Sequence, residues 1–217
     1  MTRRGADLQR RVLRRCKAEG ETALDFETTS LSPADGRVRL VSLCNKKVRA
    51  LVDFDKIKGG FPAVAHLFED GSWVVFNAGF ELRWFMSQEV YPECLDVGNL
   101  RRAILGGGNW SLKQIVLWDL DIDMDKGQQV SDWNREHLSQ EQLDYAFYDA
   151  QVTWEEWVYW GLSADEGHYR GFRMLNDMVP AVIEMEDSGM LLDKVAHAAL
   201  VEAWKREQTL RVKRIRR

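Results

Sequence analysis

Residues 22–27, with the sequence TALDFE, place two carboxylates inside an otherwise apolar segment. The alternation of side chains predicts a β-strand in which Asp25 and Glu27 point to the same face. On that face the two acids lie about 7 Å apart and repel each other unless a cation sits between them. Hard oxygen ligands favour Mg²⁺ or Mn²⁺. The pattern therefore predicts a divalent-metal site on a strand. For two such acids alone, the alternative is an edge strand with solvated side chains.

A further acid lies in a segment with helical periodicity, residues 143–154, LDYAFYDAQVTW. Ser139 followed three residues later by Gln142 predicts a capping box at the start of this helix. Tyr145 and Asp149 are four residues apart, so they share one helix face. A carboxylate with a phenol one turn away suits a metal site with a water held beside it. Taken alone, this spacing occurs by chance in many helices.

Residues 73–85, WVVFNAGFELRWF, read as a buried strand that runs into a helix, with Asn77 near the turn and Glu81 in the first helical turn. Together the D-x-E motif, the N-x-x-F motif followed by an acid, and the Y-x-x-x-D motif resemble the DEDD 3′–5′ exonucleases over residues 22–160. The resemblance is to the tyrosine subclass, which includes the proofreading domain of family A DNA polymerases, phage-type polymerases among them, and the ribonuclease D group. The histidine subclass would carry His where this chain has Asp144.

The resemblance implies an α/β fold of the ribonuclease H-like exonuclease type, a mixed five-stranded sheet flanked by helices. The residue pattern itself predicts strands at 22–27, 37–44, 48–54, 73–76 and 93–97, with helices at 62–69, 79–88, 98–105 and 111–117. We expect a basic N-terminal helix over 1–20, the exonuclease domain over 21–163 and a helical extension over 164–217. Within the extension, residues 194–215 resemble the start of the long thumb helix of family A polymerases.

The resemblance also implies two bound ions, Mg²⁺ or Mn²⁺. Asp25 would bridge both ions, and Glu27 with Asp149 would complete the first metal site. Glu81 would support the second ion through water, and Tyr145 would orient the attacking water. The phenol is a poor general base at neutral pH because its ordinary pKa is near 10.

Glu81 departs from the family pattern, which has Asp at this position. The extra methylene moves the carboxylate by about 1.5 Å, a change that a shifted water ligand absorbs, so we expect activity to survive. The resemblance implies substrate contacts from a further set of side chains: Thr28, Leu31, Asn77 and Phe80. For Leu31 and Phe80, plain core packing is the equal alternative.

The net charge of −4 is unevenly distributed along the 217 residues. Residues 1–17 and 205–217 each carry a net +6, which leaves −16 in between. An acidic middle suits a divalent-cation site, while basic ends attract phosphate backbones. The alternatives for the ends are solvated helices, or, for the Arg-rich start, an organelle transit peptide.

No apolar run approaches the ~20 residues that span a bilayer, so we expect no membrane partner. Three cysteines, an odd count at no metal-like spacing, indicate reduced thiols in an intracellular protein. We expect a cytoplasmic location, in the host cytoplasm if the chain is phage-encoded.

Three functions compete at this point. The first is a metal-dependent 3′–5′ exonuclease of the proofreading type, releasing 5′-mononucleotides from single-stranded DNA 3′ ends and working with a separate polymerase subunit. It is favoured by residues 178–193, which resemble the junction between exonuclease and polymerase in family A enzymes. The second is an RNA-trimming enzyme like ribonuclease D, favoured by residues 125–149. The third is an inactive nucleic-acid-binding or polymerase-scaffolding module, against which the filled acidic positions argue.

Overall fold

A computed structural model describes residues 11–16, 19–108, 110–124 and 131–215. The chain divides into two compact units, Met1–Ile183 and Glu184–Arg217. Residues 11–16 are helical and bury Leu13 and Cys16 in the core of the first unit. Residues 1–10 and 17–18 of the predicted N-terminal helix lie outside the described residues.

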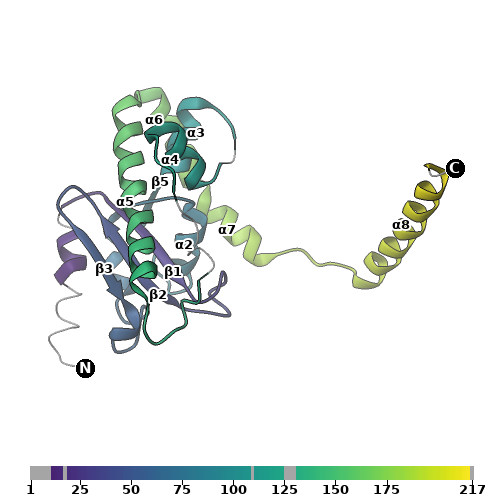
Figure 1. Cartoon of the computed structure of the whole chain (residues 1–217), viewed down its shortest axis with the longest axis horizontal. Helices are drawn as coiled ribbons and strands as arrows, with labels where there is room; N and C mark the ends of the chain where they lie inside the picture. Colours follow the sequence, from purple (N-terminus) through teal and green to yellow (C-terminus); the bar gives the residue numbers. More distant parts are fainter. Residues whose placement is uncertain (1–10, 17–18, 109, 125–130, 216–217) are drawn as a thin grey trace. The chain divides into compact units, whose positions relative to one another are not determined.

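The first unit is built on a mixed five-stranded sheet with the strand order β3-β2-β1-β4-β5 (Figure 1). Strands β1 (Thr22–Thr28), β2 (Val38–Cys44) and β3 (Arg49–Asp53) form an antiparallel meander. Strands β4 (Ser72–Val75) and β5 (Glu93–Asp96) continue the sheet in parallel with β1. The predicted α/β architecture with a mixed five-stranded sheet is thereby confirmed.

The remaining elements of this unit are helical: η1 (Phe54–Lys56), η2 (Ala65–Phe68), α2 (Ala78–Met86), α3 (Val97–Leu105), α4 (Leu112–Leu120), α5 (Gln140–Ser163), α6 (Glu166–Asp177) and α7 (Val179–Ser188), which continues into the second unit. The helix predicted over 62–69 is wrong in extent, because only the short 3₁₀ helix η2 forms there. Phe61 and Phe68 both pack into the aromatic core, so tertiary contacts override the local helical preference.

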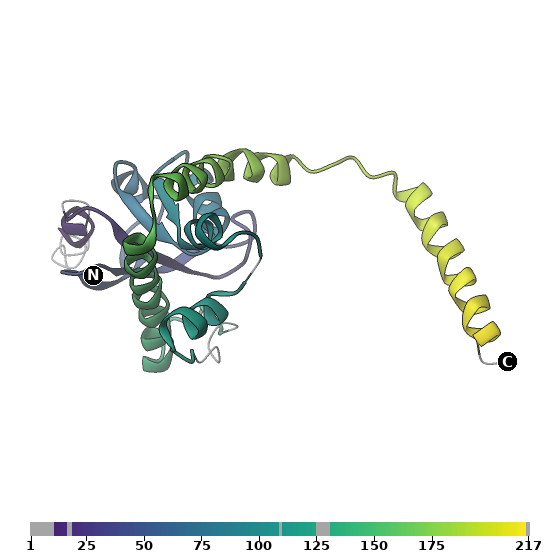
Figure 2. The same ribbon diagram turned by 90° about the horizontal axis from the view of Figure 1, so that it is seen from above.

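The alternation of side chains along β1 divides the unit into two layers. Leu24 and Phe26 enter a core of aromatic rings on one face, where Phe26 lies 5.0 Å from the ring of Phe85. Ala23 faces the other layer, which helices α3, α4, α5 and α6 help to form. Asp25 and Glu27 are two and four residues beyond Ala23, so they point to this second face. Helix α5 lies across it, in contact with β1 and β2 (Figures 1 and 2).

The second unit contains helix α8 (Lys194–Ile215), which matches the long helix predicted over 194–215. Its first turn is capped by Asp193, whose Oδ1 accepts hydrogen bonds from the N–H groups of Val195 and Ala196. None of its residues is buried, and its ion pairs are local ones, such as Arg211 with Glu207. Neither α8 nor any other helix in the described residues combines the length and the apolar character needed to cross a bilayer. The treatment of residues 164–217 as a separate domain stays a prediction.

Candidate active site

The first two predicted site residues lie side by side on β1. Asp25 is paired across the antiparallel ladder with Ser42, and Glu27 with Leu40, so these four side chains share one face of the sheet. The pairing register shifts immediately after Glu27, which ends the regular ladder at the acidic motif. Glu27 is only 8% exposed, so its carboxylate is largely removed from water. A buried charge does not contribute to core packing and is costly unless a partner compensates it.

Helix α5 brings the next two predicted residues to this face. The predicted capping box is present: Ser139 Oγ accepts from the N–H of Gln142, and Gln142 Oε1 accepts from the N–H of Ser139. One turn further, the hydroxyl of Tyr145 is hydrogen-bonded to the buried carboxylate of Asp149. Burial and then the negative charge of Asp149 raise the pKa of Tyr145, so the phenol keeps its proton at neutral pH.

Glu81 comes to the neighbourhood of Asp25 from a third element, helix α2. Strand β4 ends at Val75, Asn77 adopts a left-handed backbone conformation with φ 73°, and α2 begins at Ala78. Glu81 then lies in the first turn of α2 and is only 2% exposed. Burial and then the charge of Asp25 raise the pKa of Glu81 well above its ordinary value.

The charge of Asp25 thus acts on Glu81 and also on Tyr145, which feels Glu27 and Asp149 as well. The structure therefore brings all five predicted catalytic side chains into one neighbourhood: Asp25, Glu27, Glu81, Tyr145 and Asp149. Carboxylates gathered in this way repel one another unless protons or cations compensate their charge.

The donor set suits hard divalent cations. It consists of carboxylate oxygens, the ligands that Mg²⁺ and Mn²⁺ prefer, and Glu81 Oε2 is buried without a hydrogen-bond partner in the described part of the chain. Within those residues, no three acidic, His or Cys side chains are close enough to form a ready-made cation site.

The four side chains predicted to contact substrate lie in different environments. Leu31 is 83% exposed, so the alternative of core packing is wrong for this residue. Phe80 is half-buried, packs against the aromatic core and meets Trp84 edge-on at 6.4 Å. Thr28 Oγ1 donates to the carbonyl of Ser30 at 2.6 Å, which shapes the turn leading to Leu31. Asn77 occupies the left-handed turn before α2. Their roles towards substrate stay predictions.

Two buried polar residues beside the site escaped the sequence analysis. Ser42 is fully buried opposite Asp25, and its hydroxyl has no hydrogen-bond partner in the described residues. Asp96 ends β5, caps α3 and also accepts a hydrogen bond from the N–H of Ala78 at the start of α2. An Asp between a strand and a helix is a recognisable N-cap signal, whereas its contact with a second helix is not visible in local sequence.

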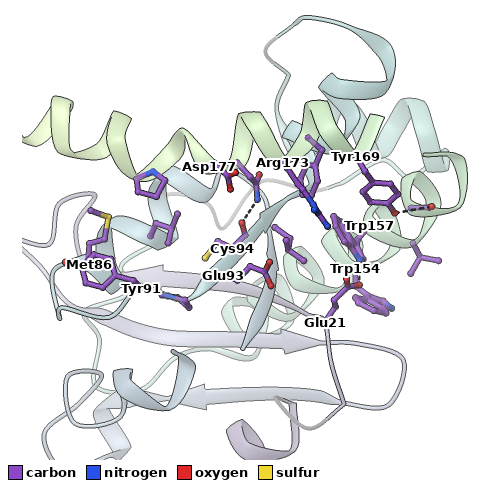
Figure 3. A pocket seen from close by; sticks show the side chains of 18 of the residues that line it. Glu21, Met86, Tyr91, Glu93, Cys94, Trp154, Trp157, Tyr169, Arg173 and Asp177 are labelled. Atoms are coloured by element: carbon purple, nitrogen blue, oxygen red, sulfur yellow. Dashed lines mark hydrogen bonds between the residues drawn. The ribbon is translucent and has the colours of Figure 1, made fainter. Parts of the chain in front are cut away.

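A pocket of about 660 Å³ lies elsewhere in the unit, between β5, the end of α2, the second half of α5 and α6 (Figure 3). Aromatic side chains of α5 and α6 form much of its wall, and the indole N–H of Trp157 donates to Glu21 at 2.7 Å. Asn176 covers the edge of β5 by donating to the carbonyl of Cys94. None of the predicted site residues lines this pocket, so it is distinct from the carboxylate cluster.

Comparisons with known proteins agree with the geometry. The chain is 28% identical over 151 residues to DNA polymerase I of Aquifex aeolicus (strain VF5), an alignment that covers 70% of this chain and 25% of that protein. The chain thus spans about a quarter of the length of this curated relative.

Solved structures show the same fold. Escherichia coli RNase D, described as an exoribonuclease involved in structured RNA processing, matches with a TM-score of 0.64 and 17% identity over 92% of this chain and 53% of that one. Brucella melitensis NrnC with bound Mg²⁺ matches with a TM-score of 0.64 and 20% identity, over 78% of this chain and 86% of that chain.

Residues 4–159, well over half of the chain, match the family model described as 3′–5′ exonuclease. These residues include β1 with its two acids, the start of α2 and the part of α5 that carries Tyr145 and Asp149. The chain belongs to the 3′–5′ exonuclease family.

Proposed function

We propose that this protein is a metal-dependent exonuclease that removes 5′-mononucleotides one at a time from single-stranded DNA 3′ ends. The observation that carries the proposal is the proximity of four carboxylates and one phenol from β1, α2 and α5: the charge of Asp25 acts on both Glu81 and Tyr145, and those of Glu27 and Asp149 act on Tyr145. Membership of the 3′–5′ exonuclease family supports the direction of attack.

Asp25, Glu27 and Asp149 would hold the divalent ions, and Glu81 would act on the second ion through water. When bound, two such ions neutralise the phosphoryl oxygens, lower the pKa of the attacking water and stabilise the leaving oxygen. The carboxylates of the chain fix where this chemistry takes place, because they come from three elements of a rigid sheet-and-helix framework.

Tyr145 would position the attacking water. Its hydroxyl proton is directed to Asp149, which leaves the oxygen lone pairs able to accept a hydrogen bond from water. The raised pKa argues against proton abstraction by this phenol at neutral pH. Leu31, which is exposed just beyond the acidic strand, would pack against a terminal base, and Thr28, Asn77 and Phe80 would line the path of the strand.

The similarity to a DNA polymerase favours DNA as substrate and a separate polymerase subunit as partner. The fold shared with an exoribonuclease keeps RNA as the alternative. Side-by-side digestion of 5′-labelled single-stranded DNA and RNA of the same sequence, in Mg²⁺ or Mn²⁺, distinguishes the two. We expect the DNA to be shortened faster. Faster shortening of the RNA would show that the enzyme trims RNA. If neither substrate is shortened in either metal, the proposed activity is wrong and an inactive nucleic-acid-binding module is the remaining function.

A further inference from the structure

Asp96 occupies an unusual place at the carboxyl end of the sheet. It is the last residue of β5 and the N-cap of α3, and it is 7% exposed. Its Oδ1 accepts hydrogen bonds from the N–H groups of Gly98 at 2.8 Å and Asn99 at 3.3 Å. These two bonds are what an N-cap aspartate ordinarily makes, and they account for one carboxylate oxygen.

The other oxygen of Asp96 serves a different helix. Its Oδ2 accepts from the N–H of Ala78, the first residue of α2, at 2.8 Å. The parallel pairing of Val75 with Asp96 explains this, because β4 and β5 end side by side and the helices that follow them start close together. Asp96 therefore caps two helices at once.

Helix α2 receives its side-chain N-cap from Asp96, which lies on a different strand. Its own N-cap residue, Asn77, is in the left-handed conformation, with φ 73° and ψ 61°, and its side chain makes no capping hydrogen bond. Asn tolerates the left-handed conformation better than most residues other than glycine, but in this conformation Asn77 leaves the first N–H groups of α2 without a cap from its own side chain. The bond from the N–H of Ala78 to Asp96 supplies a cap in its place, and Glu81 follows three residues later in the first turn.

Asp96 is not itself placed to bind a cation. Both of its oxygens accept backbone N–H groups within hydrogen-bond distance, and the residue is almost wholly buried. Its connection to the site runs through the backbone of residues 77–81, which carries Glu81, and also through its negative charge, which helps to raise the pKa of Glu81.

We propose that Asp96 is a positioning residue that sets the location of Glu81 by capping α2 across the sheet edge. This inference rests on the proposed function, because Glu81 matters only if the cluster binds catalytic cations. Groups that orient metal ligands typically contribute about 10- to 100-fold to metal affinity or rate.

The test separates the two caps of Asp96. In Asp96→Ser the shorter side chain still caps α3, since Ser and Asp are comparable N-caps, but it does not reach Ala78. In Asp96→Asn the volume is kept, and one oxygen still caps α3 while the amide N–H₂ faces the N–H of Ala78. The matched control is Asp165→Ser, at the exposed N-cap of α6, where Asp165 accepts from the N–H of His168 at 2.8 Å.

We expect both Asp96 variants to need about tenfold or more Mn²⁺ for half-maximal nucleotide release and to bind Mn²⁺ correspondingly more weakly in calorimetry without substrate. The KM for a single-stranded oligonucleotide should stay within about twofold, and Asp165→Ser should match wild type in every measurement. If both Asp96 variants bind and use Mn²⁺ like Asp165→Ser, the positioning role is wrong. If wild type binds Mn²⁺ but releases no nucleotide, the proposed function fails, and calorimetry alone decides the role of Asp96.

Discussion

Glu156 on α5 allows a quantitative prediction of stability against pH. The residue is fully buried, and both of its carboxylate oxygens are shielded from water, while the neighbouring Trp160 indole offsets that burial only in part. Nearby, Arg101 is paired with Asp119 and stacks 4.6 Å from the ring of Trp110. Burial and then the charge of Asp119 raise the pKa of Glu156 from 4.5 to about 7. Folding therefore favours the protonated, neutral form of this side chain.

The sign and size of the effect follow from linkage between protonation and folding. Because the pKa is higher in the folded chain, the stability that Glu156 contributes is fully present below about pH 4.5 and is lost as the pH rises through about 7. At 1.36 kcal/mol per pKa unit, the loss at alkaline pH is up to about 3 kcal/mol. In Glu156→Gln the side chain is neutral at every pH, so this loss is absent.

Urea unfolding of wild type and Glu156→Gln at pH 5, 6, 7, 8 and 9 measures the effect. We expect the stability of Glu156→Gln relative to wild type to increase from pH 5 to pH 9 by up to about 3 kcal/mol. Glu155→Gln is the matched control, because Glu155 is only half-buried and already accepts a hydrogen bond from Gln151 at 2.8 Å. A constant difference between Glu156→Gln and wild type across this range would refute the assignment of a buried carboxyl that resists ionisation.

Three further predictions concern the carboxylate cluster. Asp25→Ala should reduce single-turnover release of nucleotides by more than about 100-fold, the upper end of the loss seen when a group that only orients a metal ligand is removed. Its unfolding temperature should stay unchanged or rise, because the substitution removes a repelling charge. Wild-type rates in this variant would exclude Asp25 as a ligand. Tyr145→Phe should lower the rate at saturating Mg²⁺ by about 10- to 100-fold, and a loss as deep as that of Asp25→Ala would give the phenol a larger part than positioning water. Glu81→Asp should stay active with an altered requirement for Mg²⁺ and Mn²⁺, whereas Glu81→Ala should lose most of the rate; an undiminished Glu81→Ala would place Glu81 outside the site.

Local sequence carried much of the fold and most of the candidate site. The alternation in β1 correctly put Asp25 and Glu27 on one face of the strand, and Leu24 and Phe26 lie on the other. The capping box at Ser139 located the start of α5, and helical spacing then put Tyr145 and Asp149 in contact. Such features are visible because strand alternation, caps and i,i+4 neighbours depend on a few adjacent residues.

Long-range contacts were not visible in the same way. The cap that Asp96 provides for α2 joins residues 18 positions apart and exists only because β4 and β5 lie in parallel. Leu31 has an apolar side chain of the kind usually found in cores, but the turn after β1 leaves it exposed to solvent. The shortened helix at η2 has a similar cause, since packing of Phe61 and Phe68 decides the backbone there. Each of these depends on the finished tertiary structure.

We propose that the carboxylate cluster, with bound divalent cations, catalyses hydrolysis of nucleic acid from its 3′ end. The most direct measurement follows a 5′-labelled single-stranded DNA with a free 3′ hydroxyl, incubated in Mn²⁺ with wild type or with Asp149→Ala. For wild type we predict a ladder that shortens by single nucleotides from the 3′ end, with 5′-mononucleotides as the product and no reaction in EDTA. Asp149→Ala should leave the substrate intact. Release of label as a mononucleotide at the earliest times, or equal shortening by Asp149→Ala or in EDTA, would contradict the account.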